Sequence, residues 1–338
     1  MNEKMVEVKD ILKALDVITG GRLPKTADEL IPGRHPFVVE KSSNLPGKSI
    51  VETPGLVCGD LDKVIKTVGI GMTLTESMIE LAGATGVDAI ITHHPVADAA
   101  SSGGVPLKGY LDLYNLTLFE LHEAFHGLHP GIAFLHGHKV LKVDIKFGGI
   151  PGNIVFFGKV LSDIHTAGDI IKRLNDFMGL VVEERMLEEE KKIRCCDQVH
   201  ETTVAVVPKI LNGSADSPVE NILHIFPHTG FSTKHLDMAL EEKPNIDTII
   251  SSISRVLPDS PLLSKAKEKN LTFILGNSHA MEIFENGLPL AYALKRLLAQ
   301  IEIIIFKERM TFTPLDKFGV DSIRGYAQKM ANHLLKEK

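Results

Sequence analysis

Residues 87–95 read Val-Asp-Ala-Ile-Ile-Thr-His-His-Pro and place two imidazoles at the end of an apolar run. The run 87–91 has the length and the β-branched side chains of a fully buried strand. Pro95 stops further ladder pairing because proline has no N–H to donate. In open α/β sheets, ligands collect at the carboxyl ends of the strands. The stretch therefore predicts an α/β fold with a ligand site at His93 and His94.

Two adjacent imidazoles at a strand end can each give a ring nitrogen to a metal ion. Neighbours on a regular strand point to opposite faces. His93 and His94 can therefore serve one site only if the strand has already ended there, or if the site holds two ions. The same His-His pair could also lie in a solvated loop or form a hydrogen-bonded pair in the core, without a metal. Further histidines in similar settings downstream favour the metal interpretation.

The surroundings of this strand recur in the second half of the chain, which indicates an internal repeat. Each copy has a capped helix, a buried strand that begins near an Asp, a crossover, an Asn-Leu-Thr strand, and a histidine just past that strand. The two copies comprise residues 75–82, 87–91, 115–119 and His122, and residues 233–239, 246–250, 270–274 and His279. The repeat predicts two related α/β halves that contribute ligands to a shared site.

Two further pairs have the spacing of one helical face. His122 and His126 are four residues apart, and His279 and Glu282 are three apart. Glu285 lies one turn further on, and of the two carboxylates Glu282 fits the ligand role better. A neutral imidazole with a carboxylate is a common ligand set for divalent metals.

The organisation along the chain suggests three segments. We expect a helix and irregular arm over residues 1–49, a first α/β subdomain over 50–150, and a hinge with a second α/β subdomain over 151–338. In the second half, local pattern alone predicts a strand over 202–207. The charge-rich run 183–192 predicts a solvated face or a hairpin without a functional role.

Composition excludes several classes of protein. The 338 residues are 44% hydrophobic and 24% charged, as in soluble globular proteins. The net charge of -6 gives no electrostatic basis for nucleic-acid binding. Cys58, Cys195 and Cys196 form neither a disulfide framework nor a Cys-x-x-Cys zinc pair. Because the sequence shows no signal-peptide core and no membrane-length apolar run, we expect a cytoplasmic protein without membrane or nucleic-acid partners.

With these motifs the chain resembles the Nif-three-like family, whose members are often described as GTP cyclohydrolase I type 2 homologues. The resemblance covers about residues 50–310. It rests on the Pro-Gly-Leu-Val-Cys-Gly-Asp entry, the Asp-to-His-His-Pro signature, the strand that ends at a histidine, a Gly-Ile helix start, a glycine hinge and a C-terminal His-Glu pair. These are residues 53–60, 88–95, His122, 131–132, 152–158, and His279 with Glu282.

The resemblance implies two similar α/β subdomains related by a pseudo-two-fold, with a dinuclear metal site in the cleft between them. It also implies a ring-like homohexamer. The ligands carried over by position are His93, His94, His122, His279 and Glu282, and for His122 both direct ligation and a supporting role stay open. The metal expected is zinc, iron, manganese, cobalt or nickel, with one or two ions per subunit.

The chain departs from the family pattern at His126, where the family has an Asp that bridges the two metals. A neutral imidazole has one free ring nitrogen and cannot bridge two ions as a carboxylate does. The change also removes a negative charge that would offset two divalent cations. We therefore expect His126 to be a ligand in a site whose second metal is weakened, shifted or lost, with Glu123 or Asp98 as substitutes.

Two functions follow as hypotheses. The first is a metal-dependent hydrolase acting on a purine nucleotide, as the resemblance to GTP cyclohydrolase homologues implies, with Glu282 or a His moving protons. Lys108 or Lys234 would then contact phosphates, because the chain has no Walker-type phosphate loop. The second is a non-catalytic metal-binding, metal-delivery or regulatory interaction protein, which the change at His126 favours. A substrate-sized, partly basic pocket would separate the two.

Overall fold

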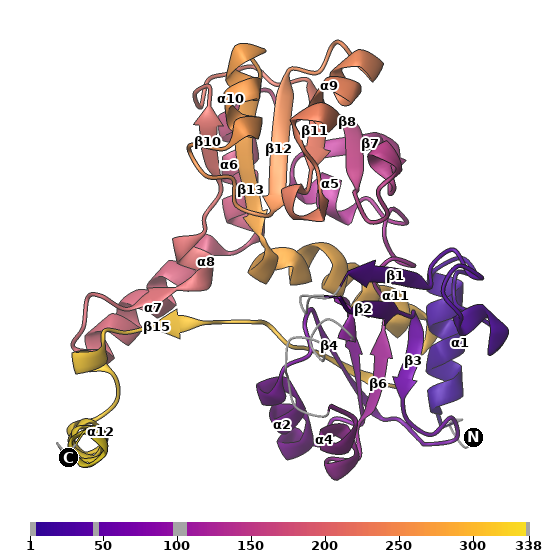
Figure 1. The fold of residues 1–338 in the computed structure, drawn as a ribbon, viewed down its shortest axis with the longest axis vertical. Coiled ribbons are helices and arrows are strands. Elements are labelled where there is room, and N and C mark those ends of the chain that lie inside the picture. Colours follow the sequence, from indigo (N-terminus) through magenta and orange to yellow (C-terminus); the bar gives the residue numbers. More distant parts are fainter. Residues whose placement is uncertain (1–4, 43–46, 97–106, 336–338) are drawn as a thin grey trace.

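The computed structural model describes residues 5–42, 47–96 and 107–335 and has two α/β halves, each built on one sheet (Figure 1). The first sheet has five strands in the order β14-β4-β5-β6-β3, and the second has six in the order β10-β13-β12-β11-β8-β7. The strands of the first sheet are β3 (Gly55–Cys58), β4 (Thr67–Gly71), β5 (Ala89–Thr92), β6 (Thr117–Glu120) and β14 (Glu302–Ile305). Those of the second are β7 (His138–Asp144), β8 (Val155–Val160), β10 (Lys209–Asn212), β11 (Asn221–Ile225), β12 (Thr248–Ile253) and β13 (Thr272–Ser278).

Helices cover both sheets, and two small strand pairs lie outside them. The pairs are β1 (Val39–Ser42) with β2 (Ser49–Glu52), and β9 (His200–Glu201) with β15 (Thr311–Phe312). The helices associated with the first sheet are α1 (Val8–Ile18), α2 (Glu76–Thr85), α4 (Leu107–Leu113) and α11 (Leu288–Leu297). The other helices are α5 (Gly131–Leu135), α6 (Ala167–Phe177), α7 (Leu180–Arg194), α8 (Thr202–Ala205), α9 (Thr233–Glu242), α10 (Pro261–Glu268) and α12 (Asp321–Leu334).

The strand predicted from residues 87–91 is β5, at the centre of the first sheet and parallel to both of its neighbours. All four of its residues are buried. Ile91 packs into the cluster that α1 and α11 cover, whereas Ile90 packs into the cluster under α2. A strand covered on both faces reads as a continuous apolar run, which is the pattern of a parallel sheet. The predicted α/β class is therefore confirmed.

The repeated letters have matching structural roles in the two sheets. The Asp88 carboxylate accepts two backbone hydrogen bonds at the start of β4, at 2.8 and 3.0 Å, and Asp247 accepts two at the start of β11, at 3.1 and 2.7 Å. Asn115 and Asn270 both adopt a left-handed backbone, with φ of 52° and 54°. Asn tolerates that conformation better than most residues. The pseudo-two-fold between the halves stays a prediction.

The sheets do not divide the chain at a single residue. Strand β7 precedes residue 150 but pairs with β8 in the second sheet. Strand β14 lies near the C-terminus but pairs in parallel with β4 in the first sheet. Helix α11, which precedes β14, also packs on the first half, because Leu290 and Leu294 share a core cluster with Ile11 of α1. The chain thus leaves the first sheet after β6 and returns to the first half with α11 and β14.

Two local predictions were wrong or incomplete. The strand predicted over 202–207 is wrong, because residues 202–205 form helix α8, whose first turn is capped by the Glu201 side chain accepting from the Val204 N–H at 3.2 Å. Local capping outweighed the β-branched composition there. The charge-rich run 183–192 is part of helix α7, stabilised by acid–base pairs at helical spacing.

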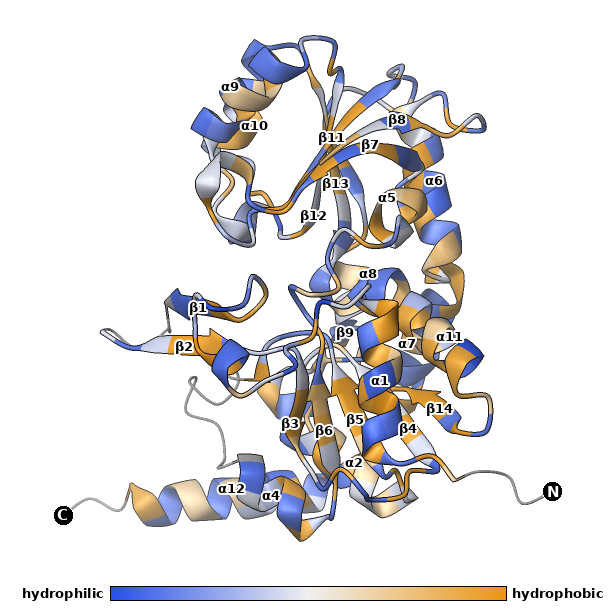
Figure 2. Cartoon of the chain, turned by 90° about the vertical axis from the view of Figure 1, so that its right-hand side faces the viewer, coloured by the Kyte–Doolittle hydropathy of each residue, from blue (hydrophilic) through white to orange (hydrophobic). Residues whose placement is uncertain are grey.

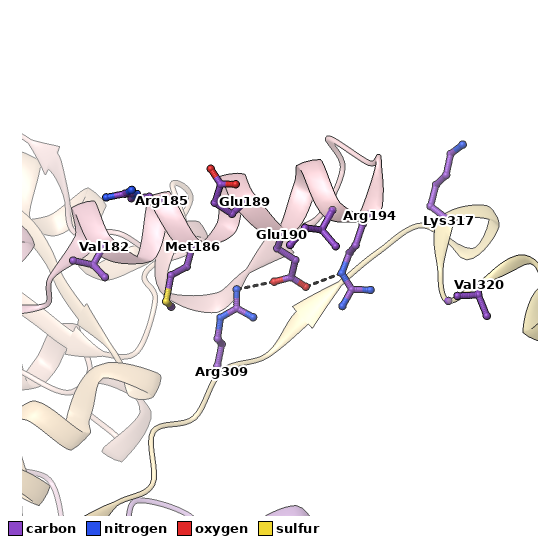
Figure 3. Close-up of a pocket in the computed structure, with 11 residues that line it drawn as sticks. Val182, Arg185, Met186, Glu189, Glu190, Arg194, Arg309, Lys317 and Val320 are labelled. Carbon is purple, nitrogen blue, oxygen red and sulfur yellow. Dashed lines mark hydrogen bonds and ion pairs between the residues drawn. The ribbon is translucent and has the colours of Figure 1, made fainter.

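The C-terminal segment with β15 and α12 lies to one side of both sheets (Figures 1 and 2). A hollow of about 850 Å³ lies between α7 and residues 309–320. Figure 3 shows Glu190 of α7 holding Arg194 and Arg309, each at 2.8 Å. None of the predicted ligands lines this hollow. Within the described ranges, no helix has the length and apolar character needed to cross a bilayer.

Candidate metal centre

The predicted ligands converge from three strand ends. His93 and His94 follow β5, His122 and His126 follow β6, and Glu282 follows β13. His93, His94 and Glu282 each offer a ligand atom, and these atoms lie within 4.8 Å of one another. The same holds for the group of His93, His122 and His126. The carboxyl ends of parallel strands meet at one edge of each sheet, and this brings together residues that lie far apart in the sequence.

Strand β5 ends before the histidine pair, which lets both side chains serve one site. The backbone N–H groups of His93 and His94 still bond to the carbonyls of Gly71, the last residue of β4, and Met72, at 3.1 and 2.8 Å. The strand conformation itself stops at Thr92. The two ring centroids are 5.5 Å apart. Because the strand has ended at Thr92, the two side chains need not point to opposite faces, and both can serve one site that holds a single ion.

The hydrogen bonds of His93 fix which ring nitrogen faces the cluster. Its Nδ1 lies 2.9 Å from the carbonyl oxygen of Leu121, which can only accept, so Nδ1 carries the proton. The lone pair on Nε2 then faces Glu282 Oε1 and His126 Nε2, both at 3.3 Å. Burial lowers the pKa of His93, so the imidazole is neutral. A neutral imidazole held through its other nitrogen is the arrangement of a metal-ligating histidine.

Glu282 supplies a buried carboxylate to the same cluster. Its Oε2 lies 2.8 Å from His94 Nε2, and its Oε1 accepts from Asn286 Nδ2 at 2.7 Å. Burial alone would raise the pKa of Glu282, but His94 and His93 outweigh it and hold that pKa well below its usual value. The ionised carboxylate and the neutral imidazole of His93 fit a divalent ion. Asn286 lies on the π-helical turn Ile283–Gly287, a rare element that is frequent at functional sites.

His279 lies at the rim of the cluster. Its ring stacks on that of His94, with centroids 4.2 Å apart and an angle of 9°. Its Nε2 is 3.7 Å from Glu282 Oε2, and its side chain is 48% exposed. It belongs to none of the compact ligand groups found among the described residues. Burial lowers the pKa of His279 to about 4, so it is neutral at pH 7.

The pairing of His122 with His126 is a single helical turn, in which the His126 N–H bonds to the His122 carbonyl at 3.3 Å. His122 Nδ1 lies 2.7 Å from Glu52 Oε1. Glu52, His122 and Glu123 form a third compact ligand group. The sequence prediction named Glu123 only as a substitute and missed Glu52. The available signal was a carboxylate at an apolar position of an alternating strand, because Ile50 and Glu52 share the buried face of β2. The other predicted substitute, Asp98, lies outside the described residues.

Lys41 of β1 neutralises these two carboxylates. Its Nζ lies 2.6 Å from Glu52 Oε2 and donates to Glu123 Oε1 at 2.9 Å. Burial disfavours the charged form of Lys41, but Glu123 and Glu52 outweigh burial and raise its pKa. Burial likewise opposes ionisation of Glu52, but His122 and Lys41 lower its pKa to about 2. Lys41 and both carboxylates are therefore charged at neutral pH.

The centre opens into a cavity of about 800 Å³ between the two halves. Its polar side includes His94, His122, Glu123 and Glu282 among the site residues. Its apolar lining is contributed by Ile132, Ile150, Ile154, Phe226 and Ile253. This volume and this mixture of surfaces are those of a site for a small molecule.

A second group of histidines is buried inside the second half, away from the cavity. His138 Nε2 lies 3.0 Å from His224 Nδ1, His224 Nε2 lies 2.8 Å from Ser252 Oγ, and Ser252 Oγ lies 2.7 Å from His136 Nε2. We call these four residues the buried histidine chain; each is 0% exposed. The histidine-rich stretch 122–138 is thus divided between two places, because β7 joins the second sheet.

Acid is expected to destabilise the protein through this chain. Burial lowers the pKa of His136 to about 4 and of His138 to about 3, and it holds that of His224 well below 6.5. Because the unfolded state binds protons first, this stability is complete above pH 6.5 and is lost as pH falls towards the folded-state values.

The matched variant is His224→Leu, followed by urea unfolding between pH 7 and pH 5. Wild type should be the more stable protein at pH 7, because the variant removes the hydrogen bonds that His224 makes with His138 Nε2 and Ser252 Oγ, while Ser252 keeps its contact with His136. The difference should shrink by up to about 1.4 kcal/mol per pH unit below 6.5, since the variant lacks one titrating group. A difference independent of pH would show that folding does not lower the pKa of His224.

Comparison with known proteins bears on this fold. Residues 37–100 match the model of the Duf34/NIF3 (NGG1p interacting factor 3) family. No curated protein sequence matches the chain.

Solved structures match over almost the whole chain. Reduced HcgD from Methanocaldococcus jannaschii has a TM-score of 0.54 at 16% identity, over 90% of this chain and 99% of that one. A Bacillus cereus protein related to NIF3 has a TM-score of 0.52 at 12% identity, over 90% of this chain and 98% of that one. The protein TTHA1606 from Thermus thermophilus has a TM-score of 0.51 at 14% identity, over 90% of this chain and 98% of that one. At these identities the likeness concerns the fold. The segment match and this shared fold confirm that the chain resembles the Nif-three-like family, as its motifs predicted.

Proposed function

We propose that the protein binds a divalent metal ion at His93, His94 and Glu282 and is a metal-dependent hydrolase of a small molecule held in the adjoining cavity. The observation that carries the proposal is that His94 and Glu282 of this ligand group line a cavity of about 800 Å³, while His93 is buried. A metal-delivery protein needs exchangeable ligands but has no need of a substrate-sized cavity. A divalent ion bound there would supply Lewis acidity, because it would lower the pKa of water and polarise the bond under attack.

Residues around the metal centre would provide a ligand, proton acceptors and a surface for the substrate. Glu282 acts as a ligand, since both of its oxygens face His93, His94 or Asn286 and its carboxylate is ionised. His279 and His228 line the cavity, and burial lowers the pKa of both, so each is neutral at pH 7 and able to accept a proton. His228 Nδ1 is held by Ser254 Oγ. The apolar wall around Phe226 would exclude water and pack against a flat ring.

The charge of the cavity bears on the choice of substrate. Among its described lining residues are Glu40, Glu123 and Glu282 but a single lysine, Lys41, which already pairs with two carboxylates. Lys108 and Lys234 do not line it. A purine nucleotide with a reduced phosphate charge, or a purine base, suits this lining better than a triphosphate. The GTP-cyclohydrolase-like activity implied by the family is kept as the first activity to assay.

A non-catalytic metal-delivery role is the second candidate. The negative lining favours it, because carboxylates raise the local concentration of free cations. The half-exposed His279 beside His94 would be a natural first contact for an incoming ion. A homohexamer and a cytoplasmic location, both expected from the sequence, belong to this proposal as well, and light scattering measures the first.

The test is hydrolysis by protein freed of metal and reloaded with one metal at a time. The panel contains GTP, GMP, guanosine and guanine, with products identified by mass spectrometry. We expect turnover that a chelator removes and that Glu282→Gln lowers by at least about 100-fold. His228→Ala should lower kcat while metal binding persists. Tight metal binding without turnover of any substrate would favour the delivery role.

A further inference from the structure

The hairpin of β1 and β2 lies between the first sheet and the second half (Figures 1 and 2), and its Lys41 lines the cavity. Lys41 is on β1, two residues after Val39, which pairs with Glu52 across the hairpin. The Lys41 side chain is only 26% exposed, and that of Glu52 is 1% exposed. The ammonium and the carboxylate therefore meet inside the protein, at the wall of the cavity.

The atoms around this ammonium are those that a divalent ion would use. Glu52, His122 and Glu123 each present a ligand atom, all within 4.8 Å of one another. Glu123 also lies beside His126, with Oε2 3.4 Å from Nδ1. Two buried carboxylates so close together repel each other unless a cation lies between them. Lys41 is that cation, at 2.6 Å from one carboxylate and 2.9 Å from the other.

We propose that the Lys41 ammonium takes the place of a second divalent ion at Glu52, His122 and Glu123, so that the chain binds one divalent ion per subunit. This inference rests on the metal centre of the proposed function. An ammonium supplies one positive charge and three N–H donors, but it has no Lewis acidity and cannot coordinate water. It would therefore keep the carboxylates ionised and in position, while the chemistry is confined to the ion at His93, His94 and Glu282.

The position of His126 agrees with this division. Its Nε2 faces His93 Nε2 at 3.3 Å, whereas its Nδ1 faces Glu123. Its ring thus separates the ligand group that contains Glu282 from the group that contains Glu52. An imidazole offers a lone pair on only one of these sides at a time. One metal ion on the His93 side and a fixed ammonium on the Glu123 side agree with a His126 ring that has its lone pair on Nε2 and its proton on Nδ1.

The experiment counts Zn²⁺ per chain on the full-length protein by elemental analysis and calorimetric titration. Lys41→Met removes the charge and keeps an unbranched side chain of similar length. Lys48→Met is the matched control, because Lys48 lies on the same hairpin and is exposed. We expect one ion in wild type and in Lys48→Met, and two in Lys41→Met. The second ion should disappear again in Lys41→Met combined with Glu52→Gln.

A further readout is thermal stability. Without Lys41 the two carboxylates lack a counter-charge, so the metal-free variant should unfold at a lower temperature than wild type, and saturating Zn²⁺ should raise its Tm more than that of wild type. Lys41→Gln replaces the methionine variant if the latter does not fold. Two tightly bound ions in wild type, or one ion in every Lys41 variant, would overturn the inference. Wild type that binds no ion would instead remove the metal centre itself.

Discussion

Replacing His93 by alanine is expected to weaken binding of a divalent ion by at least about 100-fold, since loss of a supporting residue alone costs 10- to 100-fold. His93 belongs to two of the compact ligand groups. Its Nε2 lone pair faces the centre because Nδ1 is bound to the Leu121 carbonyl. The measurement is calorimetric titration of the metal-free protein with Zn²⁺, and the Kd of the variant is compared with that of wild type.

The matched control for this variant is His224→Ala. His224 is also a fully buried histidine with two hydrogen-bond partners, but it lies in the buried histidine chain. Both variants should lose stability, and only His93→Ala should lose the metal. If His93→Ala keeps the wild-type Kd within a few-fold, the centre is not built on the end of β5. If both variants lose the metal, the loss reflects unfolding.

A second large effect is expected at Gly276 of β13, where Gly276→Ala should lower the free energy of unfolding by about 2–4 kcal/mol. A Cβ at this position would overlap His136 Nε2 and Ser252 Oγ. Both side chains are fully buried and hydrogen-bonded to each other at 2.7 Å. The added methyl must therefore displace β13 or break the buried histidine chain. Urea and thermal unfolding measure the change.

The control for the glycine variant is Gly109→Ala in α4, where a Cβ would meet no atom within 4 Å. Alanine in a helix is more favourable than glycine by about 1 kcal/mol, so this variant should be unchanged or more stable. Because β13 leads directly to Glu282, Gly276→Ala should also weaken metal binding. A loss below about 0.5 kcal/mol would mean that β13 can shift and that the chain of histidines is loosely packed.

Several site residues could be predicted because they follow strands whose type is evident locally. His93, His94, His122 and Glu282 lie just past apolar runs with clear boundaries, and parallel strands end at one edge of a sheet. His279 follows β13 in the same way but lies at the rim, since its backbone has already turned into a 3-10 helix. The position of His279 after β13 predicted that it lies near the cluster, whereas the 3-10 turn decided that its ring stays at the rim.

Glu52, Lys41 and Asn286 could not be predicted from local pattern. Glu52 meets His122, which is 70 positions away in the sequence, and Lys41 meets Glu123, which is 82 positions away. Such contacts depend on where a separate hairpin lies over the sheet. Asn286 contacts Glu282, four residues before it, but also His93, which is 193 positions away in the sequence. The division of the histidine-rich stretch has the same origin, since β7 joins a sheet formed by later strands.

The sequence by itself determined the α/β class and pointed to most of the residues that gather at the candidate metal centre, because apolar runs and their end residues act locally. Only the tertiary structure decided which charges face each other in the cleft. There a hairpin carries Lys41 between Glu52 and Glu123, and the strand β14 from the C-terminal part closes the first sheet. Electrostatic pairing depends on distance in space, and a sequence records only distance along the chain.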